Sequence, residues 1–228
     1  MPPRVVVAPL AAVVTAVVAL TWWSRRRRRR EEDPPARGRP PSVVIVFSGK
    51  RKSGKDYCAD ALLAAFPPTT AEIGRLSGPL KRAYARERGL DYDALLGATA
   101  YKERYRADMI AWGEARRAAD PGYFARLVLA EATAPVLIVS DARRRTDLDY
   151  FFDVASATRV LTVRVEAADG TRAARGWVFA VGVDDAESEC GLDDYAAWDV
   201  VIANEPERAA DTAARIAEIA RLALASLS

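Results

Sequence analysis

FSGKRKSGKD, at Phe47–Asp56, is the most informative stretch of the chain. Gly49–Lys55 matches the phosphate-loop pattern G-x-x-x-x-G-K, and only the next position departs from it, because Asp56 stands where Ser or Thr is usual. The preceding Val43–Phe47 is a short apolar run typical of a buried parallel strand, and a helix is expected after Gly54. In this setting the backbone N–H groups of the loop and the helix N-terminus surround phosphate oxygens. We therefore expect a nucleotide-binding loop rather than a structural glycine turn.

The side chains of this loop are unusual. Lys50, Arg51 and Lys52 add three cations, more than a nucleotide alone requires, which suggests that further phosphate binds nearby. Lys55 supplies a point charge to the phosphates. Asp56 offers Mg²⁺ a hard anionic oxygen, directly or through water. The alternative for Asp56 is a solvated acid in the first helical turn, where negative charge is favourable.

Further apolar runs predict a parallel sheet. Strands are expected at Val43–Phe47, Ala134–Asp141, Thr158–Glu166 and Ala197–Asn204, and long helices at Tyr101–Ala119, Tyr123–Thr133 and Pro206–Leu227. Strands that alternate with helices indicate an α/β fold with a mainly parallel sheet.

A second acid follows a predicted strand. Asp141 lies at the carboxyl end of Ala134–Asp141, where an acid that steadies Mg²⁺ is found in phosphate-transferring folds, and Arg143 and Arg144 follow it. The alternative is that Asp141 caps the next helix and that both arginines lie at the surface.

Two other groups of cations are candidates for anion binding. Lys102, Arg106 and Arg117 share one face of the predicted Tyr101–Ala119 helix, although the nearby acids also fit a solvated, salt-bridged face. Arg172 and Arg175 follow a predicted strand and are consistent with a lid whose arginines meet the phosphates. We expect the acidic stretch 182–195 to be a structural turn that pairs with those two arginines, because it has no recognisable metal-ligand spacing.

The composition excludes several kinds of chemistry. The chain of 228 residues contains no His, which removes His-based triads, metal sites and proton shuttles. Its two cysteines, Cys58 and Cys190, form neither a disulfide framework nor a zinc pattern, so a reducing compartment is expected. The net charge is +3, but residues 1–42 alone carry a balance of +6. Nucleic-acid binding by the remaining, net acidic part is therefore not expected.

The N-terminus has a different character from the rest. Residues 1–30 form an apolar extension that ends in a run of arginines, and residues 5–23 are long enough to span a membrane. An unstructured extension is the alternative, because Val and Ala dominate this run. The Pro-rich residues 31–42 predict a linker, and the domain is expected to cover residues 43–228.

Several blocks of this domain together resemble animal phosphomevalonate kinases: FSGKRKSGKDY, RLSGPLK, VSDARRR, RGWVF, GVDDAESECGLD and WDVVIAN. The resemblance runs from about Val43 to the C-terminus. It implies a three-layer P-loop kinase domain, with helices on both faces of the sheet and a small lid that carries arginines. It also implies transfer of phosphate from ATP to 5-phosphomevalonate in the mevalonate pathway of isoprenoid and sterol synthesis. The alternatives are a kinase for another small phosphorylated metabolite or a nucleotide, and an inactive nucleotide-binding scaffold.

The resemblance also implies roles for single residues. Lys55 and Asp56 would be catalytic. The general template of phosphoryl transfer, rather than the resemblance, would place Mg²⁺ at Asp56 and Asp141. The residues implied for ATP are Lys50, Arg51, Lys52, Ser53, Gly54, Lys55, Asp56 and Arg175. Those implied for the substrate are Lys102, Arg106, Arg117, Arg143, Arg144 and Asn204, and Arg126, Arg164 and Arg172 also stand in matching blocks.

One position departs from the resemblance: Glu205 stands where the family commonly has His, which puts a nucleotide contact there in doubt. A cytosolic monomer is expected, and the C-terminal Ser-Leu-Ser is not an S-K-L-type peroxisomal ending.

Overall fold

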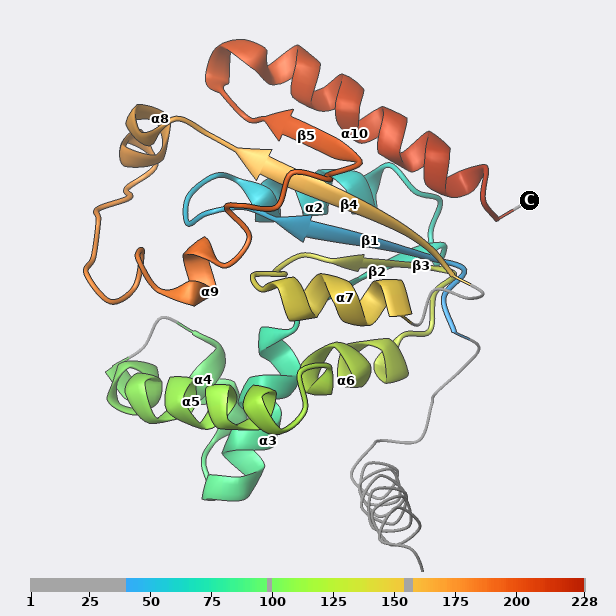
Figure 1. Cartoon of the computed structure of the whole chain (residues 1–228). Coiled ribbons are helices and arrows are strands. Elements are labelled where there is room, and N and C mark those ends of the chain that lie inside the picture. The colour runs from blue at the N-terminus through green and yellow to red at the C-terminus, as the bar shows by residue number, and fades with distance from the viewer. Residues whose placement is uncertain (1–39, 98–99, 154–157, 228) are drawn as a thin grey trace, which may run out of the picture. The chain divides into compact units, whose positions relative to one another are not determined.

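The computed structural model describes residues 40–97, 100–153 and 158–227. Within these ranges, five strands form one sheet in the order β2-β3-β1-β4-β5, and all neighbouring strands are parallel (Figure 1). The strands are β1 (Val43–Ser48), β2 (Ala71–Gly74), β3 (Val136–Val139), β4 (Arg159–Glu166) and β5 (Val200–Ala203). The predicted α/β fold with a parallel sheet is confirmed.

β1 is the centre of the sheet because its apolar residues can be buried on both faces. None of its six residues is more than 2% exposed, as expected for a strand between two parallel neighbours. Val44 and Val46 pack into the core on one face, whereas Val43, Ile45 and Phe47 pack into the core on the other. This alternation is the period of two that strands impose on their side chains.

Helices cover both faces of the sheet (Figure 1). α2 (Lys55–Ala64) and α10 (Ala209–Leu224) pack over the face of Ile45, through Leu62 of α2 and Ile216 and Ile219 of α10. The other face carries helices from the middle of the chain: α3 (Ser77–Arg88), α5 (Ala100–Ala119), α6 (Tyr123–Glu131) and α7 (Arg145–Asp153). The three-layer prediction is therefore confirmed.

An aromatic cluster joins three of the helices on that second face. The Tyr84 ring meets Trp112 edge-on at 5.8 Å, and Trp112 lies 6.3 Å from Phe124. The Tyr84 hydroxyl also donates to Asp108 at 2.6 Å. This packing holds α3, α5 and α6 together over the face of the sheet that carries Val44 and Val46.

Some elements were not predicted from the sequence. β2 is a short strand whose four residues are all only half-buried, so its apolar signal is weak. The helix α3 and the short helices α4 (Tyr92–Leu96), α8 (Asp169–Ala174) and α9 (Glu187–Cys190) were not predicted either, whereas the 3₁₀ turn η2 (Pro206–Arg208) lies at the start of the predicted Pro206–Leu227 helix. By contrast, the long helices α5, α6 and α10 confirm the predicted segments, with ends shifted by a few residues.

The predicted N-terminal extension and nearly all of the predicted linker lie outside the described residues. In the part of the chain that the structure describes, no helix has both the length and the apolar character needed to cross a membrane. The sheet begins at Val43, the residue at which the domain was expected to start.

Candidate active site

The loop between β1 and α2 depends on two glycines. Gly54 has φ +90°, and a Cβ there would lie 2.0 Å from the Asn204 side-chain nitrogen. A Cβ on Gly49 would lie 2.5 Å from the carbonyl oxygen of Val165. Only glycine tolerates both the left-handed conformation and this closeness, so the pattern G-x-x-x-x-G has a steric cause here.

The loop is held from the side of β4 and β5 through three successive carbonyl groups. Arg172 Nε donates to Arg51 O at 2.9 Å, and Arg175 Nη1 donates to Lys52 O and Ser53 O at 3.3 and 3.0 Å. Asn204 Nδ2 also donates to Ser53 O, at 2.8 Å. Since a trans peptide unit points its N–H opposite to its carbonyl, the N–H groups of these units face away from α8. The predicted ATP contact of Arg175 and substrate contact of Asn204 stay predictions, whereas their contacts to the loop are direct.

Lys55 and Asp56 open α2 at the end of the loop. The Lys55 side chain is largely buried, and its Nζ lies 3.0 Å from Asp56 Oδ1, whereas 58% of the Asp56 side chain is exposed. An exposed carboxylate in the first turn of a helix can reach a bound cation. Among the described residues, no cluster of three or more acids or cysteines could hold a metal by itself, so a metal here would need ligand or water oxygens as well.

An acidic segment, Asp184–Asp193, covers the other side of the loop. Glu189 accepts the Arg51 backbone N–H at 2.9 Å and also pairs with Arg143. Asp184 pairs with Arg51 at 2.8 Å. Asp193 pairs with Lys50 at 2.7 Å and with Arg164 at 2.9 Å.

These contacts correct the expected partners of the acidic stretch. It was predicted to pair with Arg172 and Arg175, but its ion pairs go to the cations of the loop and to Arg143 and Arg164, while Arg172 pairs with Asp169. The reason is that Arg172 and Arg175 bind loop carbonyls instead, although the charge of Arg172 still acts on Asp184.

Two acids of this segment, Asp184 and Asp193, are held in their ionised form. Burial acts to raise the pKa of Asp184, but hydrogen bonds from Trp177 and the Ala180 N–H, together with Arg51, outweigh it and lower the pKa. Burial also acts to raise the pKa of Asp193, but Lys50 and Arg164 outweigh it, and the pKa is lowered. The segment therefore places full negative charge against the cations of the phosphate loop.

Asp141 caps a helix, but not the one that follows it. Its two carboxylate oxygens accept the N–H groups of Leu76 and Ser77 at 2.6 and 3.1 Å, at the start of α3. This agrees in kind with the capping alternative, although α3 precedes Asp141 in the chain. Its predicted role in holding Mg²⁺ stays a prediction.

Arg143 is influenced by both candidate metal acids. Burial lowers the pKa of the Arg143 guanidinium, and the charges of Asp141 and Asp56 act in the opposite direction. Its direct contacts are to the acidic segment: it pairs with Glu189 and donates to the Ser188 carbonyl at 3.0 Å.

Arg117 and Arg144 each form an ion pair with an acid of the protein in this structure. Arg117 pairs with the buried Asp147 at 2.5 Å and lies over the Phe124 ring. Arg144 pairs with Glu114. The Asp147 carboxylate also accepts the backbone N–H groups of Arg143 and Arg144, at 3.0 and 3.1 Å. Direct substrate contacts of Arg117 and Arg144 stay predictions.

Arg75, Lys81 and Arg82, near the start of α3, line one hollow. Burial lowers the pKa of Lys81, and the charges of Lys102, Arg75 and Arg106 lower it further, while Asp141 opposes them. Arg75 and Lys81 belong to the block RLSGPLK, for which the sequence predicted no site role. The repulsion that Lys81 experiences from these cations favours binding of an anion there.

The predicted cationic face of α5 is only partly assembled at this group. Arg106 acts on Lys81, yet it also pairs with Glu103 on its own helix at 2.5 Å. Arg117 is buried against α7 at the other end of α5. Arg126 pairs with Asp120 at 2.8 Å.

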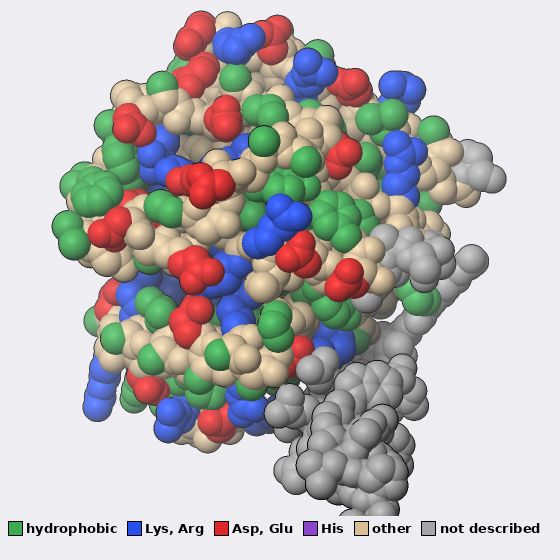
Figure 2. Space-filling model, viewed as in Figure 1, with side chains coloured by type: hydrophobic (Ala, Val, Ile, Leu, Met, Phe, Trp, Pro, Cys, Tyr) green, Lys and Arg blue, Asp and Glu red, His purple; other side chains and the backbone are tan. Residues whose placement is uncertain are grey.

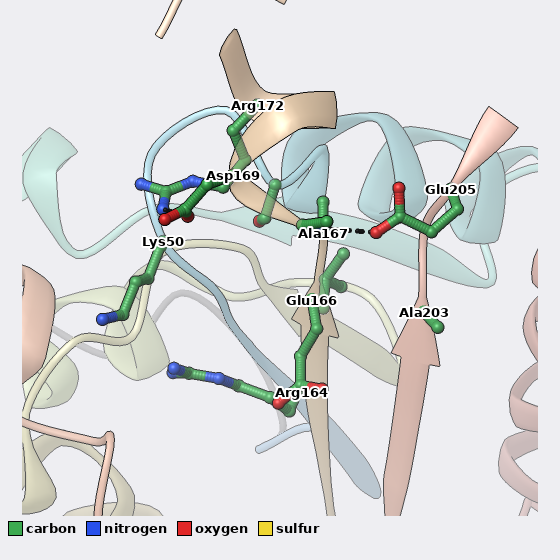
Figure 3. Close-up of a pocket in the computed structure, with 11 residues that line it drawn as sticks. Lys50, Arg164, Glu166, Ala167, Asp169, Arg172, Ala203 and Glu205 are labelled. Carbon is green, nitrogen blue, oxygen red and sulfur yellow. Dashed lines mark hydrogen bonds and ion pairs between the residues drawn. The ribbon is translucent and has the colours of Figure 1, made fainter. Parts of the chain in front are cut away.

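Two hollows flank the phosphate loop. One, of about 450 Å³, lies at the carboxyl ends of β4 and β5 and is lined among others by Lys50, Ser53, Arg164, Asp169, Arg172 and Glu205 (Figure 3). Within the described part of the chain, the buried Ser53 hydroxyl has no hydrogen-bond partner. The other hollow, of about 670 Å³, lies beside β2 and α3 and is lined among others by Asp56, Arg75, Ser77, Lys81, Arg82 and Glu131. On the face seen in Figure 2, basic and acidic side chains lie interspersed.

Comparison with known proteins agrees with this geometry. The family model for phosphomevalonate kinase matches residues 47–157. A phosphomevalonate kinase from Drosophila melanogaster is 46% identical over 169 residues, which cover 72% of this chain and 89% of the relative. The chain belongs to the phosphomevalonate kinase family. Membership of this family makes the chain a phosphate-transferring enzyme that uses a nucleotide.

Solved structures also resemble this phosphomevalonate kinase family member at low identity. A gluconokinase from Sinorhizobium meliloti 1021 matches with a TM-score of 0.39 and 19% identity, over 84% of this chain and 95% of that one. A sugar kinase from Janibacter sp. HTCC2649 matches with a TM-score of 0.37 and 16% identity, over 81% of this chain and 95% of that one.

Proposed function

We propose that this phosphomevalonate kinase family member transfers the terminal phosphoryl group of ATP to 5-phosphomevalonate and releases ADP and 5-diphosphomevalonate. The observation that carries the proposal is a glycine-dependent phosphate loop ending in Lys55 and Asp56, with a group of cations beside it around Lys81. The 46% identity to a phosphomevalonate kinase supports the choice of substrate.

The nucleotide phosphates bind at the loop in this proposal. Arg172, Arg175 and Asn204 hold the loop carbonyls from behind. Of the opposed N–H groups, that of Ser53 donates to Lys50 O at 3.1 Å within the loop, so those of Lys52 and Gly54, together with Lys55, would bind phosphate oxygens. The hollow at the ends of β4 and β5 takes the rest of the nucleotide. This assignment follows the rule that parallel sheets bind ligands at the carboxyl ends of their strands, next to the point where the strand order reverses, which here is β1.

The phosphorylated acceptor binds on the opposite side, at the hollow beside β2 and α3. Lys81 and its neighbouring cations Arg75, Lys102 and Arg106 repel one another, and a dianionic phosphate group relieves that repulsion. Arg143 pairs with Glu189, which accepts the Arg51 N–H of the loop, and the charge of Asp56, which lines this hollow, acts on Arg143. We assign to Arg143 a contact with the phosphoryl group that moves between the two substrates.

Asp56 fits a magnesium ligand by chemistry and exposure. It presents a hard oxygen beside Lys55, with 58% of its side chain exposed. Both oxygens of Asp141 already accept a backbone N–H, so Asp141 would contact the ion through water. When bound, Mg²⁺ would neutralise charge on the phosphates of ATP.

The transfer itself requires little proton movement. A phosphate oxygen of the acceptor attacks the terminal phosphorus of ATP, a new P–O bond forms, and the bond to the bridging oxygen breaks as ADP leaves. The attacking oxygen is already deprotonated near neutral pH, because the second pKa of a phosphate monoester is about 6. No general base is needed, which agrees with a chain that contains no His. Lys55 and the nearby arginines stabilise the charge that shifts during transfer.

A coupled assay with ATP and 5-phosphomevalonate tests the proposal. Turnover is expected with 5-phosphomevalonate and should be slower with any nucleoside monophosphate. Lys55→Met should abolish turnover, whereas Arg221→Met, at an exposed position of α10, should retain most of it. Faster phosphorylation of a nucleotide would point to a nucleotide kinase, and ATP binding without transfer would point to a scaffold.

We also propose a cytosolic, monomeric enzyme, and residues 5–23 can be tested as an anchor. Membranes from cells that express the full chain or residues 43–228 are washed with carbonate. Pelleting of only the longer form would support the anchor, and a full chain that stays in the supernatant would reject it.

A further inference from the structure

Glu205 joins the end of β5 to the start of α8. Its carboxylate accepts the backbone N–H of Ala168 at 2.6 Å with one oxygen and the hydroxyl of Thr171 with the other. Figure 3 shows Glu205 reaching from the β5 side toward the segment that follows β4. Hydrogen bonds from Thr171 and Ala168 lower the pKa of Glu205, so the carboxylate is ionised and both contacts are charge-assisted.

α8 is also tied down at its other end. Arg175, which ends the helix, donates through Nη2 to the carbonyl oxygen of Asn204 at 2.8 Å. The neighbouring residues Asn204 and Glu205 therefore hold both ends of a helix of only six residues. Such a helix is too short to be stable alone, so its position depends on these contacts.

The position of α8 in turn determines the backbone of the phosphate loop. Arg172 and Arg175 bind the carbonyls of Arg51, Lys52 and Ser53. If the start of α8 moved, Arg172 would lose Arg51 O, and the peptide units of the loop could rotate. The loop would then have to be ordered again by each incoming nucleotide, which weakens binding.

We propose that Glu205 is a positioning residue for the nucleotide: it fixes α8, and through Arg172 and Arg175 it orients the N–H groups of the phosphate loop. The proposal rests on the proposed function, because it names the loop as the site for ATP. Glu205 also lines the hollow assigned to the nucleotide, so the test has to separate positioning through Thr171 from direct contact with the nucleotide.

The test compares Glu205→Ala and Thr171→Val in the full chain. Glu205→Ala should raise KM for ATP about tenfold, as expected for loss of hydrogen bonds to a charged group, and leave KM for 5-phosphomevalonate within about twofold. Thr171→Val removes one of the partners of Glu205 without changing charge and should raise KM for ATP in the same direction. The double variant should be no worse than Glu205→Ala, because both changes break one connection. Glu207→Ala, which removes an exposed carboxylate two residues further on, is the matched control and should match the parent enzyme.

Several outcomes would overturn the proposal. They are an unchanged KM for ATP in Glu205→Ala, an equal rise in KM for both substrates, or a Thr171→Val enzyme that behaves as the parent while Glu205→Ala does not. The last result would make Glu205 a direct ligand of the nucleotide. ATP binding is also measured by equilibrium dialysis on every variant. If the parent enzyme fails to phosphorylate 5-phosphomevalonate, the proposed function fails, but weaker ATP binding by Glu205→Ala and Thr171→Val would still support the positioning role.

Discussion

Asp56 is the residue at which this phosphate loop departs from the usual pattern, and its surroundings favour a role at a metal over a role in stability. The carboxylate is more than half exposed and its ion pair joins it to its own neighbour Lys55. A pair between adjacent, partly exposed residues contributes little to the free energy of unfolding. The Asp56 carboxylate can therefore orient the Lys55 side chain and bind a cation.

Asp56→Asn should lower kcat at least about tenfold while ATP binding largely persists, because metal positioning is lost more than phosphate contact. Steady-state kinetics and equilibrium dialysis with ATP measure the two effects. Asp60→Asn, on the exposed side of the same helix, is the control and should keep kcat. An unchanged kcat in Asp56→Asn would show that Asp56 is only a solvated acid in the first turn of α2.

Lys81 should make the KM for 5-phosphomevalonate depend on pH in the alkaline range, at a lower pH than an ordinary lysine would. Burial and the charges of its cationic neighbours lower its pKa, so its positive charge is present at neutral pH and is lost at a lower pH than usual. KM for 5-phosphomevalonate should therefore rise as the pH becomes alkaline, while KM for ATP changes less. Lys81→Arg, which stays charged, should remove this rise, and Lys81→Met should raise KM at all pH values. A Lys81→Met enzyme with the parent KM would show that Lys81 does not contact the acceptor.

At the scale of elements, the site is formed where β1, α2, α8 and the end of β5 meet at the phosphate loop. α2 begins where Gly54 adopts a left-handed conformation against Asn204. The same Asn204 binds the carbonyl of Ser53. The close approach of two segments about 150 residues apart thus requires that the loop have no side chain at position 54.

Gly54→Ala should disrupt the loop. The new Cβ would lie 2.0 Å from Asn204, and a non-glycine residue at φ +90° adds about 1–2 kcal/mol of conformational cost. We expect a lower melting temperature and loss of ATP binding, measured by thermal unfolding with and without ATP. Gly170→Ala is the control, because nothing lies within 4 Å of a Cβ there and the residue is helical. Equal ATP binding by Gly54→Ala and the parent would contradict this account of the loop.

At the scale of the whole molecule, the acidic segment Asp184–Asp193 binds cations and an N–H group of the phosphate loop that a negatively charged ligand would also bind. Glu189 accepts the Arg51 N–H and pairs with Arg143, while Asp184 and Asp193 pair with Arg51 and Lys50. A carboxylate on a loop N–H competes with a phosphate oxygen for the same donor. Binding of ATP is therefore expected to displace Glu189.

Glu189→Gln should lower KM for ATP by about two- to fivefold. The neutral side chain competes less well with the phosphates of ATP, and the lost interaction has about the strength of one exposed or partly buried ion pair. Initial rates at several salt concentrations measure it, and the difference between variant and parent should shrink as salt screens the charges. Glu187→Gln, an exposed acid on the same helix, is the control. A higher KM for ATP in Glu189→Gln would mean that Glu189 instead holds Arg143 and the loop in place for the nucleotide.

Local pattern was sufficient for some features of this protein. β1, the loop and the long helices could be predicted because burial on both faces, the glycine spacing and the helical period are properties of contiguous residues. β2 could not, since four half-buried residues at a sheet edge carry little signal. Arg75 and Lys81 were missed for a different reason: in a chain rich in Arg and Lys, no single cation differs from the others until its neighbours are known.

The amino-acid sequence by itself determined the kind of protein: a parallel α/β kinase domain with a phosphate loop, no His chemistry and a family resemblance carried by long blocks. Only the tertiary structure decided the partners of the charged residues. It placed Arg172 and Arg175 on loop carbonyls, and it paired the acidic segment with Lys50 and Arg51 across more than 130 positions. The physical reason is that Coulomb interactions and hydrogen bonds depend on distance in space, and that distance is set by how the strands and helices pack.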